Sequence, residues 1–212
     1  MVVAEAPRRL AGHGGLHGGV PAEVLFRRLT RAAPGLLGAE GAARGRITIG
    51  LVSLIEALNE EIVEIEQQIA QLFNAHPDQH IFAELPRSGM VRAATLLAEI
   101  GDCRERFPSD DALAALAGAS PSTRQSGKRN QTVFWWACNK RLRSALMDFA
   151  NGSRMADPWA ADIYQRAVAR GCRHPHAIRI LARAWIRVIW RCWQDGQAFD
   201  PARHRGRQTL AA

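Results

Sequence analysis

Apolar side chains recur at a regular spacing in the first half of the chain. They follow one another at alternating steps of four and three residues, at Leu51, Ile55, Leu58, Ile62, Ile65, Ile69 and Leu72. This 3.5-residue repeat is typical of a coiled-coil helix. We therefore predict a stem helix over residues 47–75, ended by Asn74 and Pro77, that forms a homo-oligomer through residues 51–72. The alternative is an amphipathic helix that packs on its own domain.

Helical spacing also dominates the second half, where Gly and Pro separate short apolar-periodic segments. Near the C-terminus one stripe at this spacing predicts a buried core face: Ile178, Leu181, Trp185, Val188, Ile189 and Trp193. Residues 1–46 hold one short helical pattern, PAEVLFRRLTRAA, within a Gly- and Ala-rich linker, and residues 205–212 form a tail. We predict an all-α protein: the heptad-patterned stem followed by a compact helical domain over residues 82–204.

Charge is divided unequally between the two halves. Residues 1–84 carry 7 Lys and Arg against 10 Asp and Glu, whereas residues 85–212 carry 21 against 10. A basic region of this kind attracts polyanions, because neutralised phosphates release their counterions. The second half is therefore expected to bind nucleic acid, although a basic surface that serves only solubility is the alternative.

Composition also limits where the protein acts. No uncharged apolar run is long enough to span a membrane, and Gly-rich sequence follows Arg8 and Arg9 where a signal peptide would need an apolar stretch. The four cysteines are too widely spaced for CxxC pairs, which indicates reduced thiols. We expect a cytoplasmic protein without a membrane partner.

The segment LPRSGMVRAATLLAEIG has the pattern of a helix-hairpin-helix turn. In such a turn small residues let the backbone and a helix N-terminus approach a DNA phosphate. Gly89 occupies one glycine position, while Arg87 replaces the other. Both residues are predicted to contact DNA, and a plain helix start is the alternative.

A second polar segment, ASPSTRQSGKR, covers residues 119–129 and is too hydrophilic for a core element. By itself it indicates an exposed structural or phosphate-binding loop. It is not a Walker A loop, because Ser122 stands where the first glycine would be. A serine here becomes a nucleophile only if a base or a cluster of cations activates it.

Several motifs strongly resemble, in order, the C-terminal part of bacterial insertion-sequence transposases of the 110/116/902 family. The resemblance spans about residues 82–204, and residues 21–75 look like the linker and stem that join the catalytic domains of this family. The matching segments are LPRSGMVRAATLLAEIGD, FPSDDALAALAGASPSTRQSGK, NKRLRSAL, PWAADIYQRAVARG and RVIWRCWQDGQAFDP.

The resemblance implies DNA transposition in which a serine attacks a phosphodiester, assisted by a DEDD carboxylate domain and guided by a bridge RNA. The segment QSGK places the nucleophile at Ser126, with Ser120 and Ser122 as rivals. Gly127 would permit close backbone approach. The cations expected to neutralise phosphate charge are Arg124, Lys128, Arg129, Lys140, Arg141 and Arg143. Arg179, Arg183, Arg187 and Arg191 recur every four residues, which favours a row that faces DNA.

One departure from the family pattern qualifies the expected activity. The carboxylate domain of the family precedes the stem, and residues 1–46 have neither its strands nor its acidic residues. The expectation is an N-terminally truncated transposase that binds DNA but is inactive by itself. It would hold no metal or cofactor, because Mg²⁺ belongs to the missing domain. The alternative is a non-catalytic nucleic-acid-binding or dimerisation module.

Overall fold

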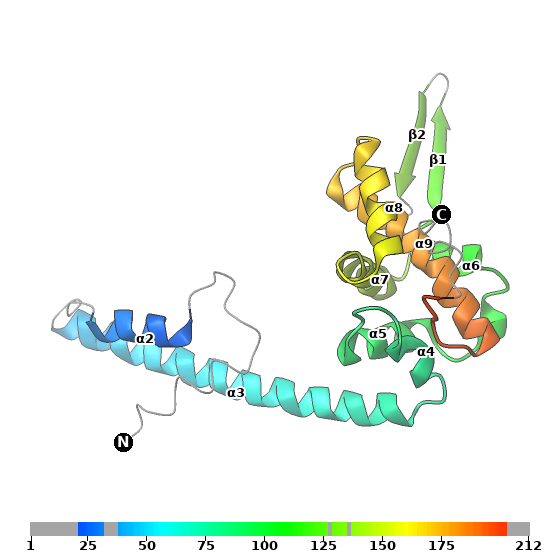
Figure 1. The fold of residues 1–212 in the computed structure, drawn as a ribbon. Coiled ribbons are helices and arrows are strands. Elements are labelled where there is room, and N and C mark those ends of the chain that lie inside the picture. Colours follow the sequence, from blue (N-terminus) through cyan, green and yellow to red (C-terminus); the bar gives the residue numbers. More distant parts are fainter. Residues whose placement is uncertain (1–20, 32–37, 127–128, 135–136, 203–212) are drawn as a thin grey trace. The chain divides into compact units, whose positions relative to one another are not determined.

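The computed structural model describes residues 21–31, 38–126, 129–134 and 137–202. The chain divides into two units, one up to Glu60 and one from Glu61 onward. The division falls inside the longest helix, well before the start of the helical domain predicted at residue 82. The second unit holds most of the packed helices (Figure 1).

Helices account for most of the described structure. The helices are α2 (Ala22–Arg31), α3 (Ala39–Ala75), α4 (Gln79–Ala83), α5 (Met90–Ile100), the 3-10 helix η1 (Arg104–Arg106), α6 (Asp110–Leu116), α7 (Lys140–Ser153), α8 (Pro158–Ala169) and α9 (His174–Asp195). No helix in the described ranges is long and apolar enough to cross a membrane.

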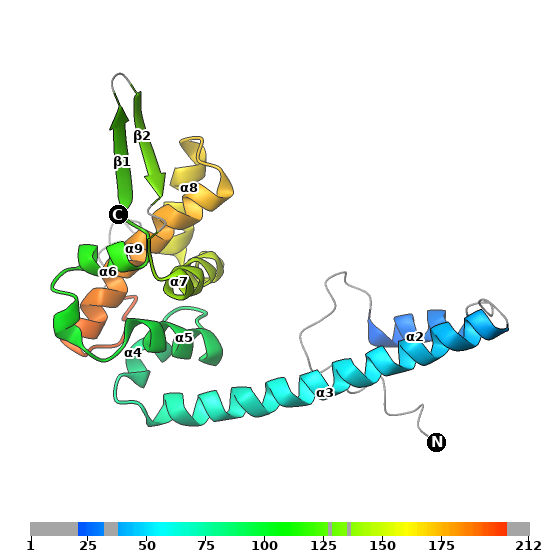
Figure 2. The ribbon, with the colours of Figure 1, turned by 180° about the vertical axis from the view of Figure 1, so that it is seen from behind.

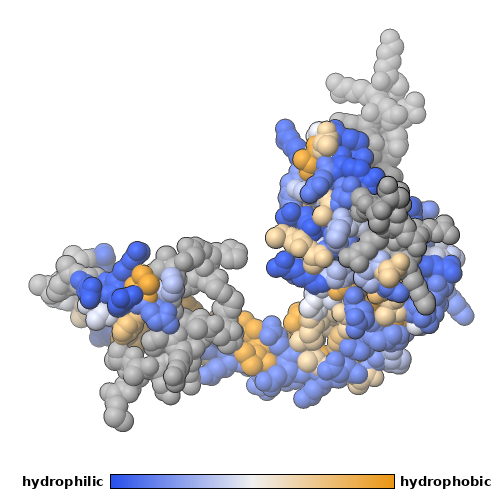
Figure 3. Space-filling view, in the orientation of Figure 1, coloured by the Kyte–Doolittle hydropathy of each residue, from blue (hydrophilic) through white to orange (hydrophobic). Residues whose placement is uncertain are grey.

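The stem prediction corresponds to α3, which begins at Ala39 rather than at residue 47 and ends at Ala75, just before Pro77. Its earlier start is reasonable because the preceding residues are mainly Ala, Glu and Arg, which favour helix. Six of the seven heptad side chains are solvent-exposed, from 45% for Ile65 to 77% for Leu72, and Ile69 is half-buried. Figure 3 shows hydrophobic surface on this helix. The seam is therefore uncovered for much of its length, and its pairing in a coiled coil stays a prediction.

Helix α9 is the centre of the second unit. It packs against α6, α7 and α8, and α4 also contacts it. The predicted core stripe is confirmed, since Leu181, Trp185, Ile189 and Trp193 are at most 1% exposed. The ring of Trp185 meets three other aromatic rings edge-on, those of Phe149, Trp159 and Phe199. Burial of these large rings fixes how the surrounding helices cross.

A buried carboxylate ties the start of α4 to the end of α9. Asp78 accepts a hydrogen bond from Nη2 of Arg104 at 2.6 Å and another from Nε1 of Trp193 at 3.1 Å. Arg104 also donates from Nε to the carbonyl of Trp193 at 2.8 Å. Because Asp78 is only 7% exposed, its charge requires these partners.

The polar segment after α6 corrects the expectation of a purely helical fold, because it forms two strands where a loop was expected. Pro121–Ser126 (β1) and Arg129–Phe134 (β2) form an antiparallel pair, in register from Pro121 opposite Phe134 to Ser126 opposite Arg129. The ribbon projects beyond the helices of the second unit (Figures 1 and 2). Paired strands satisfy backbone hydrogen-bonding groups of a polar segment without a core.

Candidate nucleic-acid interface

A tight turn joins α4 to α5 and carries one of the predicted DNA contacts in an unusual conformation. The amide of Ser88 donates to the carbonyl of Leu85 at 3.1 Å, and Arg87 has a φ of 58°. This left-handed conformation costs a non-glycine residue about 1–2 kcal/mol. Nη1 of Arg92 stabilises the turn by donating to the carbonyls of Arg87 at 2.8 Å and Ser88 at 3.2 Å.

Helix α5 begins directly after this turn without a capping side chain. Its N-cap is Gly89, and no acidic residue stands in its first turn. The first amide groups of a helix lack intrahelical acceptors, and the helix dipole makes this end electropositive. The start of α5 is thus suited to an anion, and the cationic side chains nearby have the same preference.

Helix α7 lies beside α5, and residues of the two helices line one surface depression. Asn139 caps it, because Oδ1 accepts from the amides of Arg141 at 3.0 Å and Leu142 at 3.1 Å. Nδ2 of Asn139 donates to Glu99 of α5 at 2.8 Å, which ties the two helices together. Lys140 and Arg141 are exposed at this N-terminus. Cations there oppose the helix dipole, at a cost of about 0.3–1 kcal/mol each, so their placement favours a binding role over a stabilising one.

We call the depression between these two helices the α5–α7 cleft. It brings together Arg87, Gly89 and Arg141, three of the predicted DNA-binding residues. Its lining residues are Arg87, Ser88, Gly89, Met90, Val91, Arg92, Thr95, Glu99, Arg141, Ser144, Ala145, Asp148, Asn151, Gly152 and Met155.

Arg92 and Gly152 are among the cleft residues that the sequence did not predict. Arg92 lies one helical turn after Gly89, a spacing that could have placed it on the same face. Gly152 lets α7 approach, since a Cβ there would lie 3.3 Å from Nη1 of Arg92. No local signal marks Gly152, because its neighbour comes from another helix.

The remaining predicted site residues lie elsewhere. Ser126, Arg124 and Arg129 belong to the β1–β2 ribbon, whereas Gly127 and Lys128 lie outside the described residues. For Ser126 the structure gives the backbone register, opposite Arg129. Ser120 is half-buried immediately before β1, and Ser122 lies within β1.

The predicted row of arginines on α9 is largely engaged within the chain. Arg183 donates from Nη1 to Asp110 at 2.8 Å and from Nη2 to Asp111. Although burial raises the pKa of Asp110, the hydrogen bonds and charges of Arg183 and Arg187 outweigh it and hold this pKa below its usual value. The pair therefore stabilises the fold at neutral pH and is lost as the pH falls through the folded-state pKa. Arg183 is a structural residue, which corrects the expectation that the whole row faces DNA.

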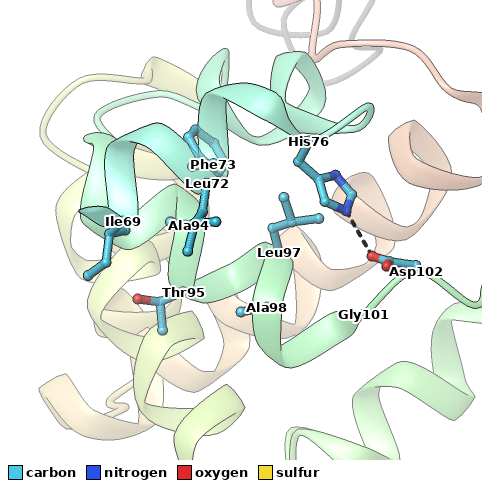
Figure 4. A pocket seen from close by; sticks show the side chains of 10 residues that line it. All are labelled: Ile69, Leu72, Phe73, His76, Ala94, Thr95, Leu97, Ala98, Gly101 and Asp102. Atoms are coloured by element: carbon cyan, nitrogen blue, oxygen red, sulfur yellow. Dashed lines mark hydrogen bonds and ion pairs between the residues drawn. The ribbon is translucent and has the colours of Figure 1, made fainter. Parts of the chain in front are cut away.

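A separate apolar groove lies between the last turns of α3 and helix α5 (Figure 4). Ile69 and Leu72 line one wall, and Leu97 lies on the other. At one end Nε2 of His76 is 2.9 Å from Oδ1 of Asp102, and Nδ1 of His76 accepts from the amide of Asp78. Since the amide fixes Nδ1 as the acceptor, Nε2 carries the proton donated to Asp102. The heptad seam thus continues into a groove shared with α5.

Comparison with known proteins shows that the sequence of this chain is similar to those of transposases. Residues 79–165 match the model of the transposase IS116/IS110/IS902 family. A mini-circle protein of Streptomyces coelicolor, named as a transposase for IS117, is 31% identical over 161 residues, which cover 76% of this chain and 39% of that protein.

Two further relatives come from insertion elements. The 43.6 kDa protein of IS110, also of Streptomyces coelicolor, is 32% identical over 76% of this chain and 40% of its own length. The 42 kDa protein of IS900 from Mycobacterium paratuberculosis is 31% identical over 72% of this chain and 38% of its own length. The chain thus spans about two fifths of the length of these relatives. The family match over residues 79–165 and these relatives together support the IS116/IS110/IS902 transposase family for this chain.

Proposed function

We propose that this chain carries the DNA-binding domain of a transposase and that the α5–α7 cleft binds the DNA backbone. The observation that supports this most directly is a single cleft with cationic residues toward both ends: Arg87 with the uncapped start of α5 at one end, and Arg141 at the start of α7 toward the other. The uncapped start of α5 offers amide donors to a phosphate, and the guanidinium groups supply charge. The turn resembles that of a helix-hairpin-helix, with Arg87 in a conformation that normally selects glycine.

Arg87→Gly tests the cleft because stability and binding should change in opposite directions. Glycine relieves the left-handed strain, so the free energy of unfolding should rise by about 1 kcal/mol. Loss of one phosphate contact should reduce the slope of log affinity against log salt by up to about 0.9 for duplex DNA. Fluorescence anisotropy in a salt series, combined with urea unfolding, measures both quantities.

A matched control comes from Arg166, which pairs with Asp162 on α8 and lies outside the cleft. Arg166→Ala should leave the salt slope unchanged, whereas Arg141→Ala should reduce it as Arg87→Gly does. Equal slopes for all four proteins would remove the cleft from the interface. Absence of duplex binding at low salt would reject the proposed function itself.

We further propose that Ser126 is the nucleophile of strand transfer. The Oγ–P bond would form as one P–O bond to a deoxyribose breaks, and the departing oxygen would leave as a hydroxyl group after taking up a proton. In the strand register, Arg124 and Ser126 occupy positions on one face of the ribbon, with Arg129 directly opposite Ser126. Such positions would bring cations to the charge that develops on phosphorus. The proposed reaction would also require metal-binding carboxylates, Mg²⁺ and a guide RNA.

The stem is proposed to join two copies of the chain. Leu51, Ile55, Leu58 and Ile62 are about half exposed and repeat at heptad spacing, so a second stem would bury them. Glu61 and Glu66 flank the seam, and pairing two acidic stems brings like charges together.

Ile62→Asp should therefore convert the dimer to a monomer, because it places a charge in the seam. Added salt should favour the wild-type dimer by screening the acidic flanks, in contrast to its effect on DNA binding. Light scattering at two salt concentrations checks both effects, with Glu60→Asp outside the seam as control. A dimer with a dissociation constant of about 10⁻⁵ M, which is a weak affinity, would be detected at tens of micromolar. If the wild-type protein is monomeric there and Ile62→Asp does not change its mass in solution, pairing of the stems is contradicted.

A further inference from the structure

A second depression, the α7–α9 groove, lies along the same helix α7. Arg143 of α7 and Arg179 and His174 of α9 line it, together with Asp148 and Asn151. Arg143 was predicted to bind DNA, but it does not line the α5–α7 cleft. In this groove the neighbouring cation of Arg143 is Arg179 of α9 rather than a residue of the α5–α7 cleft.

The electrostatics of this groove favour an anion. Burial lowers the pKa of Arg179, and the nearby positive charge of Arg143 lowers it further. A guanidinium nevertheless stays protonated at physiological pH, so two like charges lie close together in a partly desolvated place. A phosphate bound between them would offset this repulsion and replace the lost hydration.

Three depressions follow one another across the surface of the second unit. Asp148 and Asn151 line both the α5–α7 cleft and the α7–α9 groove. Pro175 and Arg179 line both the α7–α9 groove and a third hollow at the α8–α9 turn, which we call the α8–α9 depression. Each depression therefore shares a wall with the next, and cations line all three.

The residues that line the three depressions indicate what kind of molecule binds there. Arg170 and Arg173 add charge to the α8–α9 depression. No Phe, Tyr or Trp side chain is among the described residues that line the three depressions. Base stacking needs such rings, whereas backbone binding needs spaced cations, so the lining is suited to phosphates.

We propose that the three depressions form one continuous track for the DNA sugar–phosphate backbone, in which Arg143 and Arg179 bind phosphates beyond those held in the α5–α7 cleft. This inference rests on the proposed DNA-binding function and extends it to a second, separable set of contacts. Asp148 is a carboxylate on the wall that the cleft and the groove share, and it opposes the passing phosphates.

Binding of the full chain to duplex DNA in a salt series tests the track. The double variant Arg143→Ala, Arg179→Ala should reduce the slope of log affinity against log salt by up to about 1.8, twice the value of 0.9 per phosphate. The reduction should appear with duplexes longer than about one helical turn and shrink with shorter ones that fill only the cleft. Arg166→Ala, which removes an exposed arginine outside all three depressions, is the control.

Asp148→Asn is expected to increase the affinity for DNA, a change that misfolding of the variant would not produce. Removing this carboxylate should tighten binding about two- to fivefold at low salt, the range expected for one exposed charge. If Arg87→Gly weakens binding while the double variant and Asp148→Asn behave like Arg166→Ala, the track is wrong and the cleft proposal stands. If the double variant loses affinity for an RNA duplex but not for DNA, the track serves RNA and the DNA assignment is overturned. If wild-type protein does not bind duplex DNA, the proposed function fails first.

Discussion

Ser126→Ala is expected to abolish the covalent protein–DNA adduct while leaving DNA affinity within about twofold, since one hydroxyl contributes little to electrostatic binding. The reaction mixture supplies a related carboxylate domain, its guide RNA and Mg²⁺ together with this chain. The substrate is a nicked suicide duplex, which traps the phosphoserine ester for detection on a denaturing gel. Alanine removes the attacking oxygen, so the loss should be complete rather than partial.

The rival serines supply the matched controls. Ser122 shares with Ser126 its position on one face of β1, and Ser120 precedes the strand. Ser120→Ala and Ser122→Ala should both form the adduct at the wild-type level. An adduct that persists in Ser126→Ala and disappears in one of the other variants would transfer the role to that serine. If wild-type protein binds DNA but gives no adduct with any supplied domain, the non-catalytic binding module becomes the better account.

Asp78→Ala is expected to lower the free energy of unfolding of the helical domain by about 2–4 kcal/mol. The substitution leaves the Trp193 indole N–H buried without its acceptor and separates Arg104 from its carboxylate. The upper limit for a broken buried pair is not reached, because the side chain of Arg104 is 35% exposed and water can solvate it. All six tryptophans follow residue 134, so intrinsic fluorescence during urea unfolding reports on this domain.

Two variants separate the buried network from a simple charge effect. Asp78→Asn keeps one acceptor oxygen and the side-chain volume, so it should lose about half as much stability as alanine. Asp102→Ala removes an exposed carboxylate that pairs with His76 and should cost less than about 1 kcal/mol. Equal, small losses for Asp78→Ala and Asp102→Ala would show that the network does not stabilise the domain.

The β1–β2 ribbon illustrates where reasoning from the sequence was incomplete. Polar composition predicted a loop for this segment, and the absence of an apolar alternation hid the strands Pro121–Ser126 and Arg129–Phe134. A signal was present, because two short segments flank the dipeptide Gly127-Lys128, and Gly at the first position of a two-residue connection is typical of hairpins. Hydrophobic periodicity predicts a strand only where apolar and polar residues alternate, and this polar segment has no such alternation.

For the α5–α7 cleft, the sequence indicates individual residues but not how they are arranged in space. The segment LPRSGMVRAATLLAEIG indicates a glycine-containing turn, and the charge of Arg141 makes it a candidate phosphate ligand. That both residues line one cleft was not predictable, since Arg87 and Arg141 are separated along the chain by α5, α6 and the ribbon. The left-handed backbone of Arg87 was signalled only by its place at a glycine position of the turn pattern, because residues other than glycine rarely adopt this conformation.

By itself the sequence determined the features that depend on neighbours along the chain: the exposed heptad seam of α3, the buried stripe of α9 and the separation of acidic from basic regions. These follow from helical geometry, which places residues three or four apart on one face. Only the tertiary structure decided which arginines line a depression and which are taken up by carboxylates, as Arg183 is by Asp110. The neighbours of each arginine depend on how α5, α6 and α7 pack against one another and against α9. Close packing around Trp185 and Trp193 sets this arrangement through many contacts at once.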